Sequence, residues 1–141
     1  MSASIKPKPL KLTRPEPTEA AVLDAVRRAL ALHPAVVWFE RMNSGAGFLW
    51  RPGGVKSQFM RFGFPGCPDI LGQLVDGRLL AIEVKSPSGT VSKDQAAFLQ
   101  QATKHGALAL VARSVDEVLA ALQGVLRDLN SARENARVVE R

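Results

Sequence analysis

The chain has 141 residues and a formal net charge of +6, and 46% of its residues are hydrophobic. This length permits one domain with a single core, and the hydrophobic content excludes a chain that is disordered throughout. No apolar run is long enough to cross a membrane and the N-terminus lacks the apolar segment of a signal peptide, so we expect an intracellular protein. The positive charge favours a polyanionic partner, most often nucleic acid.

The N-terminal part of the chain predicts an arm followed by a helix. Residues 1–17 are rich in Lys, Arg and Pro and are expected to form a flexible basic arm, before a single domain over residues 18–130 and a polar tail over residues 131–141. Thr18 is a suitable N-cap for a helix that starts at Glu19 and stops before Pro34. Glu19 lies on the apolar stripe of that helix, an unusual place for a surface acid.

The remaining elements follow in the order expected for an α/β sandwich with a mixed sheet. Residues 35–41 are typical of a strand, and residues 42–45 of a turn or loop. Residues 47–66 predict a loose hairpin or long loop, residues 68–85 a hairpin, and residues 107–113 a buried strand. Ser92 with Gln95 has the capping-box pattern of a helix that ends near Gly106, and Ser114 with Glu117 that of a last helix over residues 115–129.

The hairpin at residues 68–85 has two possible registers around its Asp-Gly turn. A two-residue turn would place Asp69 on the opposite face of the sheet from Glu83 and Lys85. A three-residue loop with Gly77 in the left-handed conformation would instead pair Asp69 directly with Glu83 and leave Lys85 on the same face. Only the second register produces one wholly apolar face, so we predict it. That face contains Ile70, Gly72 and Leu74 with Leu80, Ile82 and Val84.

The predicted register implies a metal site. Directly paired residues have Cβ atoms about 4.5–5.5 Å apart, and two carboxylates that close repel unless a proton or a cation lies between them. Oxygens from Asp69 and Glu83 with the Val84 carbonyl suit Mg²⁺ or Mn²⁺. Lys85 could orient or deprotonate water, or stabilise the charge of a phosphorane. These residues predict metal-assisted hydrolysis of a phosphodiester.

Each candidate residue also has a simpler explanation. Glu83 and Lys85 could be a charge pair on an edge strand, with Asp69 capping a turn. Glu19 could be an acid that favours the macrodipole at a helix N-terminus. A capping-box role explains Gln95 fully.

The basic residues of the segment at residues 47–66 have two explanations as well. Arg51, Lys56 and Arg61 could belong to a solvated loop. Alternatively, because they alternate with aromatic residues, they could form a surface for phosphates and bases. The aromatic residues are Phe48, Trp50, Phe59 and Phe62.

Together these residues resemble the PD-(D/E)XK nuclease superfamily and, within it, the stand-alone VRR-NUC domains of phages and bacteria. The resemblance covers roughly residues 19–118 and rests on the motifs E-A-A-V-L, R-M-N-S-G, F-P-G-C-P-D-I, I-E-V-K-S and S-K-D-Q-A-A-F-L. Their order and spacing also resemble archaeal Holliday junction resolvases. The resemblance implies a restriction-endonuclease-like αβββαβα sandwich with a central mixed sheet.

The resemblance also implies roles for individual residues. Glu19, Asp69 and Glu83 would be metal ligands, Lys85 the catalytic lysine, and Gln95 a residue that reaches into the site. For the first ligand, two further acids nearby, Glu16 and Asp24, are alternatives to Glu19.

A second group of residues would contact DNA. Asn43, Ser44 and Gly45 match a family segment near the cleavage site, and Arg41 precedes them as a phosphate contact would. Stand-alone members resemble junction resolvases in being homodimers, which would provide two sites for two strands.

Two hypotheses about function follow. The first is a Mg²⁺- or Mn²⁺-dependent endonuclease of DNA repair that selects DNA structure, such as branches or Holliday junctions, because no base-reading element is present in the sequence. The second is a non-catalytic nucleic-acid-binding module that has kept the nuclease fold.

Overall fold

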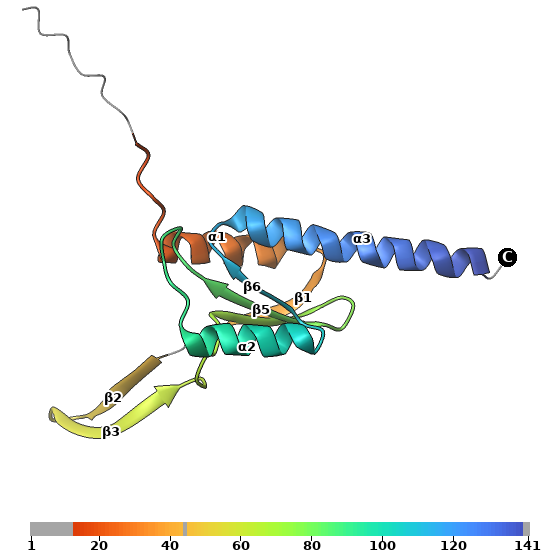
Figure 1. Ribbon diagram of the computed structural model, residues 1–141. Helices are drawn as coiled ribbons and strands as arrows, with labels where there is room; N and C mark the ends of the chain where they lie inside the picture. Colours follow the sequence, from red (N-terminus) through yellow and green to blue (C-terminus); the bar gives the residue numbers. More distant parts are fainter. Residues whose placement is uncertain (1–12, 44, 140–141) are drawn as a thin grey trace, which may run out of the picture.

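The computed structural model describes residues 13–43 and 45–139 (Figure 1). Its elements follow the predicted order, with an additional strand pair inserted after the first strand. None of the helices in these two ranges is long and apolar enough to cross a membrane. The elements are α1 (Glu19–Leu32), β1 (Val36–Arg41), β2 (Gly45–Arg51), β3 (Val55–Phe62), β4 (Ile70–Leu74), β5 (Leu79–Val84), α2 (Lys93–Lys104), β6 (Leu108–Ala112) and α3 (Val115–Val139).

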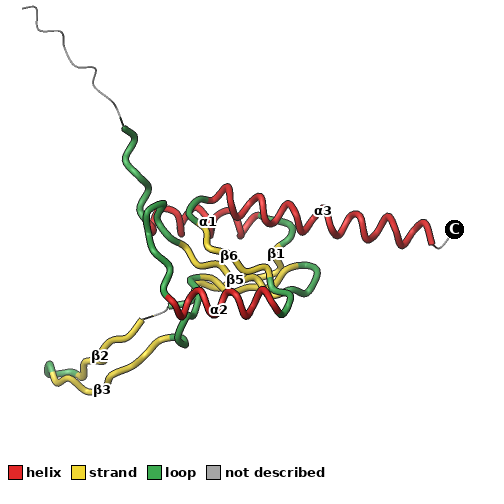
Figure 2. Tube along the Cα trace, viewed as in Figure 1, coloured by secondary structure: helices red, strands yellow, loops and turns green. Residues whose placement is uncertain are grey.

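A mixed four-stranded sheet forms the centre of the fold, in the order β1-β4-β5-β6. The β1–β4 and β4–β5 pairs are antiparallel, and β5 and β6 are parallel because α2 provides the crossover between them. Helices α1 and α3 cover one face and α2 covers the other (Figures 1 and 2). Without the β2–β3 pair, the order is the predicted αβββαβα of a restriction-endonuclease-like sandwich.

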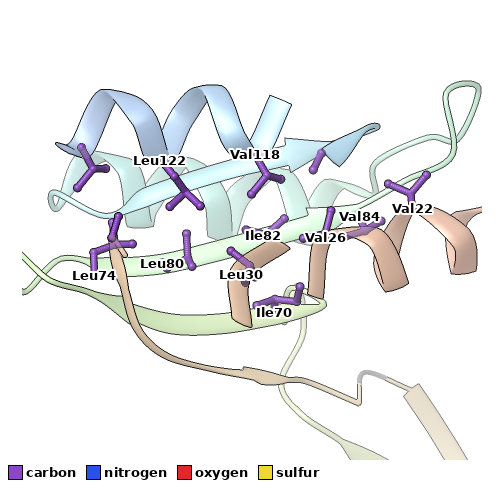
Figure 3. Packing of buried hydrophobic residues seen from close by; sticks show 13 residues of the cluster. Val22, Val26, Leu30, Ile70, Leu74, Leu80, Ile82, Val84, Val118 and Leu122 are labelled. Carbon is purple, nitrogen blue, oxygen red and sulfur yellow. The ribbon is translucent and has the colours of Figure 1, made fainter. Parts of the chain in front are cut away.

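The core lies between the sheet and the α1–α3 layer (Figure 3). The face of the β4–β5 hairpin that was predicted to be apolar is buried there. It packs against the apolar stripe of α1. Thr18 caps this helix as predicted, because its Oγ1 atom accepts from the Ala21 backbone amide at 3.2 Å. The core residues of the hairpin and the helices include Ile70, Leu74, Leu80, Ile82 and Val84 with Val22, Val26, Leu30, Val118 and Leu122.

The turn between β4 and β5 has the predicted three-residue form. Gly77 has a φ of 89°, and the Leu74 amide donates to the Arg78 carbonyl at 2.9 Å. Gly72 pairs with Leu80 and Ile70 with Ile82, as the predicted register requires. The register is therefore confirmed.

Strands β2 and β3 form a regular hairpin, where the sequence predicted a loose hairpin or a long loop. They pair antiparallel in a two-stranded sheet of their own. Gly53 and Gly54 have φ values of 95° and 76° at the turn, a conformation that few other residues adopt. The glycine and basic residues of this segment interrupt the alternation of apolar and polar residues by which a paired strand is normally predicted.

Two further expectations are corrected by the fold. The last helix does not end at residue 129 but continues to Val139, because residues 130–139 contain helix-favouring Ala, Arg and Glu and no Gly or Pro. The strand β6 is half-buried, with only Ala112 fully buried, because it lies at the edge of the sheet and has a strand neighbour on one side only.

We predict that Gly77→Ala lowers the free energy of unfolding by about 1–2 kcal/mol. A Cβ at Gly77 would meet nothing within 4 Å, so the cost comes from the left-handed backbone and not from a clash. Gly77→Asn should cost less, because Asn tolerates this conformation. The measurement is urea unfolding followed by circular dichroism.

Gly124→Ala is the matched control for that prediction. Gly124 lies inside α3 with space for a Cβ, so the same substitution should there raise the free energy of unfolding by about 0.5–1 kcal/mol. Equal effects of the same sign at both glycines would contradict a left-handed requirement at Gly77.

Candidate active site

The β4–β5 hairpin places Asp69 beside Glu83 at the end of the sheet where β5 finishes. Ile70 pairs with Ile82 and both face the core, so the next residues outward, Asp69 and Glu83, face each other on the opposite side of the sheet, which α2 covers. The Asp69 Oδ2 atom accepts a hydrogen bond from the Val84 amide at 2.8 Å. The predicted common face of these two carboxylates is thus confirmed.

Glu83 is the charged residue at the centre of this site and is only 1% exposed. Its Oε1 atom accepts from Lys85 Nζ and from Gln95 Nε2, both at 2.6 Å. Its Oε2 atom is buried and has no hydrogen-bond partner among the residues that the structure describes. Burial raises the pKa of Glu83, although the bond from Lys85 acts in the opposite direction.

Lys85 links the acids of two elements. Its Nζ atom lies 2.6 Å from Glu83 Oε1 on β5 and 3.9 Å from Glu19 Oε2 on α1. Burial alone would lower the pKa of Lys85, but Glu83, Glu19 and Asp69 together raise it above the ordinary lysine value. The contacts with Glu83 and Glu19 therefore favour the ammonium form of Lys85 while no cation is bound.

Gln95 has both of the roles that the sequence presented as alternatives. Its side-chain Oε1 accepts from the backbone amide of Ser92 at 2.9 Å. The Ser92 hydroxyl accepts from the backbone amide of Gln95, so the capping box of α2 is complete. The Nε2 group of the same side chain donates to Glu83. The first turn of α2 is thereby tied to the buried carboxylate.

Glu19 is the first residue of α1 and its side chain is 52% exposed. Together with Asp69 and Arg41 it lines a cavity of about 340 Å³. The two other candidate acids have other partners, since Glu16 accepts from the Ser88 hydroxyl at 2.8 Å and Asp24 pairs with Arg28 at 2.6 Å. Of the three acids, Glu19 is therefore the one that contacts Lys85.

The donor atoms of the site suit a hard cation only in part. In the described ranges, no three Asp, Glu, His or Cys side chains gather closely enough to hold a metal ion by themselves. However, the Oε2 of Glu83 is buried and unpartnered among the described residues, and an unpaired buried oxygen is costly unless a proton or a cation satisfies it. Besides burial, the Asp69 carboxylate is near enough to raise the pKa of Glu83. Mg²⁺ commonly takes one or two carboxylates and completes its shell with water and phosphate oxygens.

The predicted nucleic-acid contacts lie in two places. Arg41, at the end of β1, is exposed on the cavity that Glu19 lines. Asn43 is exposed in the next loop. Met42 joins that loop to the site, because its backbone amide donates to the Asp69 carbonyl at 2.7 Å. Arg61 lines a separate cavity of about 400 Å³ at the base of the β2–β3 hairpin.

The side chains of three predicted contacts lie outside the described part of the chain. Ser44 lies outside it entirely, whereas the backbones of Arg51 and Lys56 are described.

Arg113 is a site residue that sequence inspection missed. It follows β6, and its Nη1 donates to the carbonyls of Ser86 at 2.8 Å, Pro87 at 3.3 Å and Gly89 at 2.6 Å. These carbonyls belong to the loop that begins directly after Lys85. Arg113 therefore holds the chain that leaves the active site, although a lone arginine after a strand carries no sequence signal for that role.

We predict that the stability of the metal-free protein depends on Glu83 in a pH-dependent way. Because its pKa is raised on folding, the folded chain keeps a proton that the unfolded chain has already released. The free energy of unfolding should therefore fall as the pH rises from the ordinary glutamate pKa of 4.5 through the raised value. Glu83→Gln should remove this part of the slope in urea titrations with EDTA.

Glu134→Gln, an exposed change on α3, should leave the slope as it is in the wild type. A difference in stability between the wild type and Glu83→Gln that stays constant across the pH range would contradict the raised pKa.

We also predict that Arg113→Met loosens the loop after Lys85. The change keeps an unbranched side chain but removes three hydrogen bonds of about 1 kcal/mol each, about 3 kcal/mol together, so amide exchange at Gly89 should accelerate roughly 100-fold. Hydrogen exchange followed by NMR measures this effect. Arg127→Met on the exposed side of α3 should leave the Gly89 amide unchanged, and equal exchange in both variants would show that Arg113 does not hold the loop.

Comparison with known proteins places this site in a family. Residues 19–116, more than half of the chain, match the model of the VRR-NUC domain, and this range includes Glu19, Asp69, Glu83, Lys85 and Gln95. Comparisons with curated proteins and with solved structures gave no significant match. The chain therefore belongs to the VRR-NUC family, the nuclease domains that are part of the PD-(D/E)XK superfamily.

Proposed function

We propose that this nuclease domain is a divalent-metal-dependent endonuclease that hydrolyses DNA phosphodiester bonds with Mg²⁺ or Mn²⁺. The observation that carries the proposal is the buried Glu83 carboxylate, which has one oxygen unpartnered and lies beside both Asp69 and Lys85. A fold gains nothing from burying an unpaired carboxylate oxygen, whereas a cation site needs one.

Asp69, Glu83 and the Val84 carbonyl would hold the ion, with Glu19 completing its surroundings from α1. A bound divalent cation would supply Lewis acidity toward the phosphate and a more acidic water molecule. The contacts of Asp69 support its role, since the Val84 amide holds one carboxylate oxygen at 2.8 Å and orients the group. Gln95 orients Glu83 in the same manner.

Lys85 would act on the substrate by its charge. As an ammonium group between Glu83 and Glu19, it neutralises the acids while no cation does so. When Glu83 is neutralised in another way, Lys85 can donate to a nonbridging phosphate oxygen and stabilise the charge that develops there.

The charge of the surrounding surface supports DNA as the substrate. Between Glu40 and Asp69 the chain contains no acidic residue and four basic ones, Arg41, Arg51, Lys56 and Arg61. Such a segment binds phosphates without reading sequence. We therefore propose selectivity for DNA structure, such as branches or Holliday junctions, by Arg41, Asn43 and Ser44 near the site and by the basic hairpin.

A homodimer would complete this function, because two sites are needed to cut two strands of a junction. We propose this assembly together with an intracellular role in DNA repair in a bacterium or phage. Both proposals rest on the likeness to stand-alone VRR-NUC domains and junction resolvases.

Cleavage assays test the proposal directly. Wild-type protein should cut flap or four-way DNA in preference to linear duplex when Mg²⁺ or Mn²⁺ is present, and EDTA should abolish cleavage. Asp69→Asn and Lys85→Ala should each reduce the rate by at least about 100-fold, because each removes a charge at the reacting phosphate. Asp128→Asn, an exposed change on α3, is the matched control and should cleave normally.

The alternative is a non-catalytic nucleic-acid-binding module. It is favoured by one observation, that Lys85 already neutralises Glu83 at 2.6 Å without a third carboxylate at metal-binding distance in the described part of the chain. Binding of DNA without cleavage, unaffected by Asp69→Asn or Lys85→Ala, would support this alternative over the nuclease.

A further inference from the structure

The β2–β3 hairpin stands apart from the layered body of the protein (Figures 1 and 2). Within the described ranges, its two strands pair only with each other. A two-stranded hairpin alone is marginally stable in water unless it packs against another element. The hairpin is therefore a candidate interaction surface.

One face of this hairpin combines aromatic and basic residues. Phe48 and Phe59 pair across the strands, with ring centroids 5.4 Å apart and ring planes at 65°. They are 45% and 56% exposed. The neighbouring pair on the same face is Ala46 with Arg61, because side chains two residues apart along a strand lie on one face.

The charge of the hairpin decides between possible partners. The hairpin contains three basic residues and no acidic one, so two copies packed face to face would repel each other. A purely apolar partner would leave Arg61 without a counter-ion. A polyanion with aromatic faces satisfies both kinds of side chain, and unpaired nucleic-acid bases have that chemistry.

Both ends of the hairpin are tied to the active site. Before β2, the Met42 amide donates to the Asp69 carbonyl at 2.7 Å. After β3, the Phe64 ring packs on Phe98 of α2 with centroids 5.1 Å apart. A strand held by the hairpin would therefore continue toward Asp69 and toward the first turn of α2, which holds Glu83.

The chain after β3 also packs tightly on α2 at Gly66, where there is no room for a side chain. Gly66 packs so closely on α2 that a Cβ there would lie 2.2 Å from the Asp94 carbonyl oxygen. Its φ of 77° also requires glycine. The base of the hairpin is therefore held rigidly against the helix that carries Gln95.

We propose that the face formed by Phe48, Phe59 and Arg61 binds unpaired bases of DNA beside a branch point. The two rings stack on bases and Arg61 binds the adjoining phosphate. Bases inside a duplex are covered by their neighbours, so the rings engage only where a strand is unpaired. This inference rests on the proposed function and identifies the hairpin as the element that distinguishes branched from linear DNA.

The test uses binding, so that it does not depend on cleavage. In the Asp69→Asn background, affinity is measured by fluorescence anisotropy for flap DNA and for linear duplex of equal length. Phe59→Ala should weaken binding of flap DNA roughly tenfold or more and change duplex binding less than about twofold, because stacking requires exposed bases. A 2-aminopurine in the flap should be quenched by the parent protein and not by Phe59→Ala.

Two further variants guard against trivial explanations. Phe59→Leu keeps an apolar side chain in the strand but loses the ring, so it should weaken flap binding nearly as much. Trp38→Leu removes an exposed aromatic residue on β1 and should leave both affinities unchanged. Circular dichroism checks that each variant keeps its fold.

The outcomes separate this inference from the proposed function. If no DNA is ever cut but flap binding still depends on Phe59, the hairpin inference stands and the nuclease proposal fails. Equal losses for flap and duplex DNA in Phe59→Ala, or normal flap binding by Phe59→Leu, would overturn the hairpin inference even for an active nuclease.

Discussion

The burial of Glu83 organises the functional half of this molecule. A carboxylate that is 1% exposed must be matched by donors, and these come from Lys85 on the same chain segment and from Gln95 on α2. The sheet and the helix are thereby joined by charged hydrogen bonds where a core would normally use apolar contacts. Its second oxygen, left without a partner, retains the electrostatic cost that a cation would relieve.

The rest of the site follows from how that carboxylate is supported. The hairpin register places Asp69 beside it, Glu19 at the start of α1 lies 3.9 Å from its partner Lys85, and Arg113 holds the loop that follows Lys85. These residues come from helices on both faces of the sheet as well as from its strands. The β2–β3 hairpin, in contrast, forms a separate two-stranded sheet whose contacts with the body described above lie at its base.

Sequence inspection succeeded where local rules decide. The left-handed Gly77, the register that follows from it, and the capping residues Thr18 and Ser92 were all predictable from turn and cap chemistry. It was less accurate where patterns are diluted or elements meet. The hairpin β2–β3 was predicted only as a loose hairpin or a long loop, α3 continued ten residues beyond the predicted end, and the strand expected to be buried lies at the edge of the sheet.

The sequence by itself determined which two carboxylates and which lysine share a face, because alternation along a paired strand leaves no freedom once the turn is known. Only the tertiary structure decided that Gln95 both caps α2 and holds Glu83, and that Arg113 holds the loop after Lys85. These contacts join residues 12 and 24 or more positions apart on different elements. Such contacts depend on how helices dock on the sheet, and no local pattern encodes that docking.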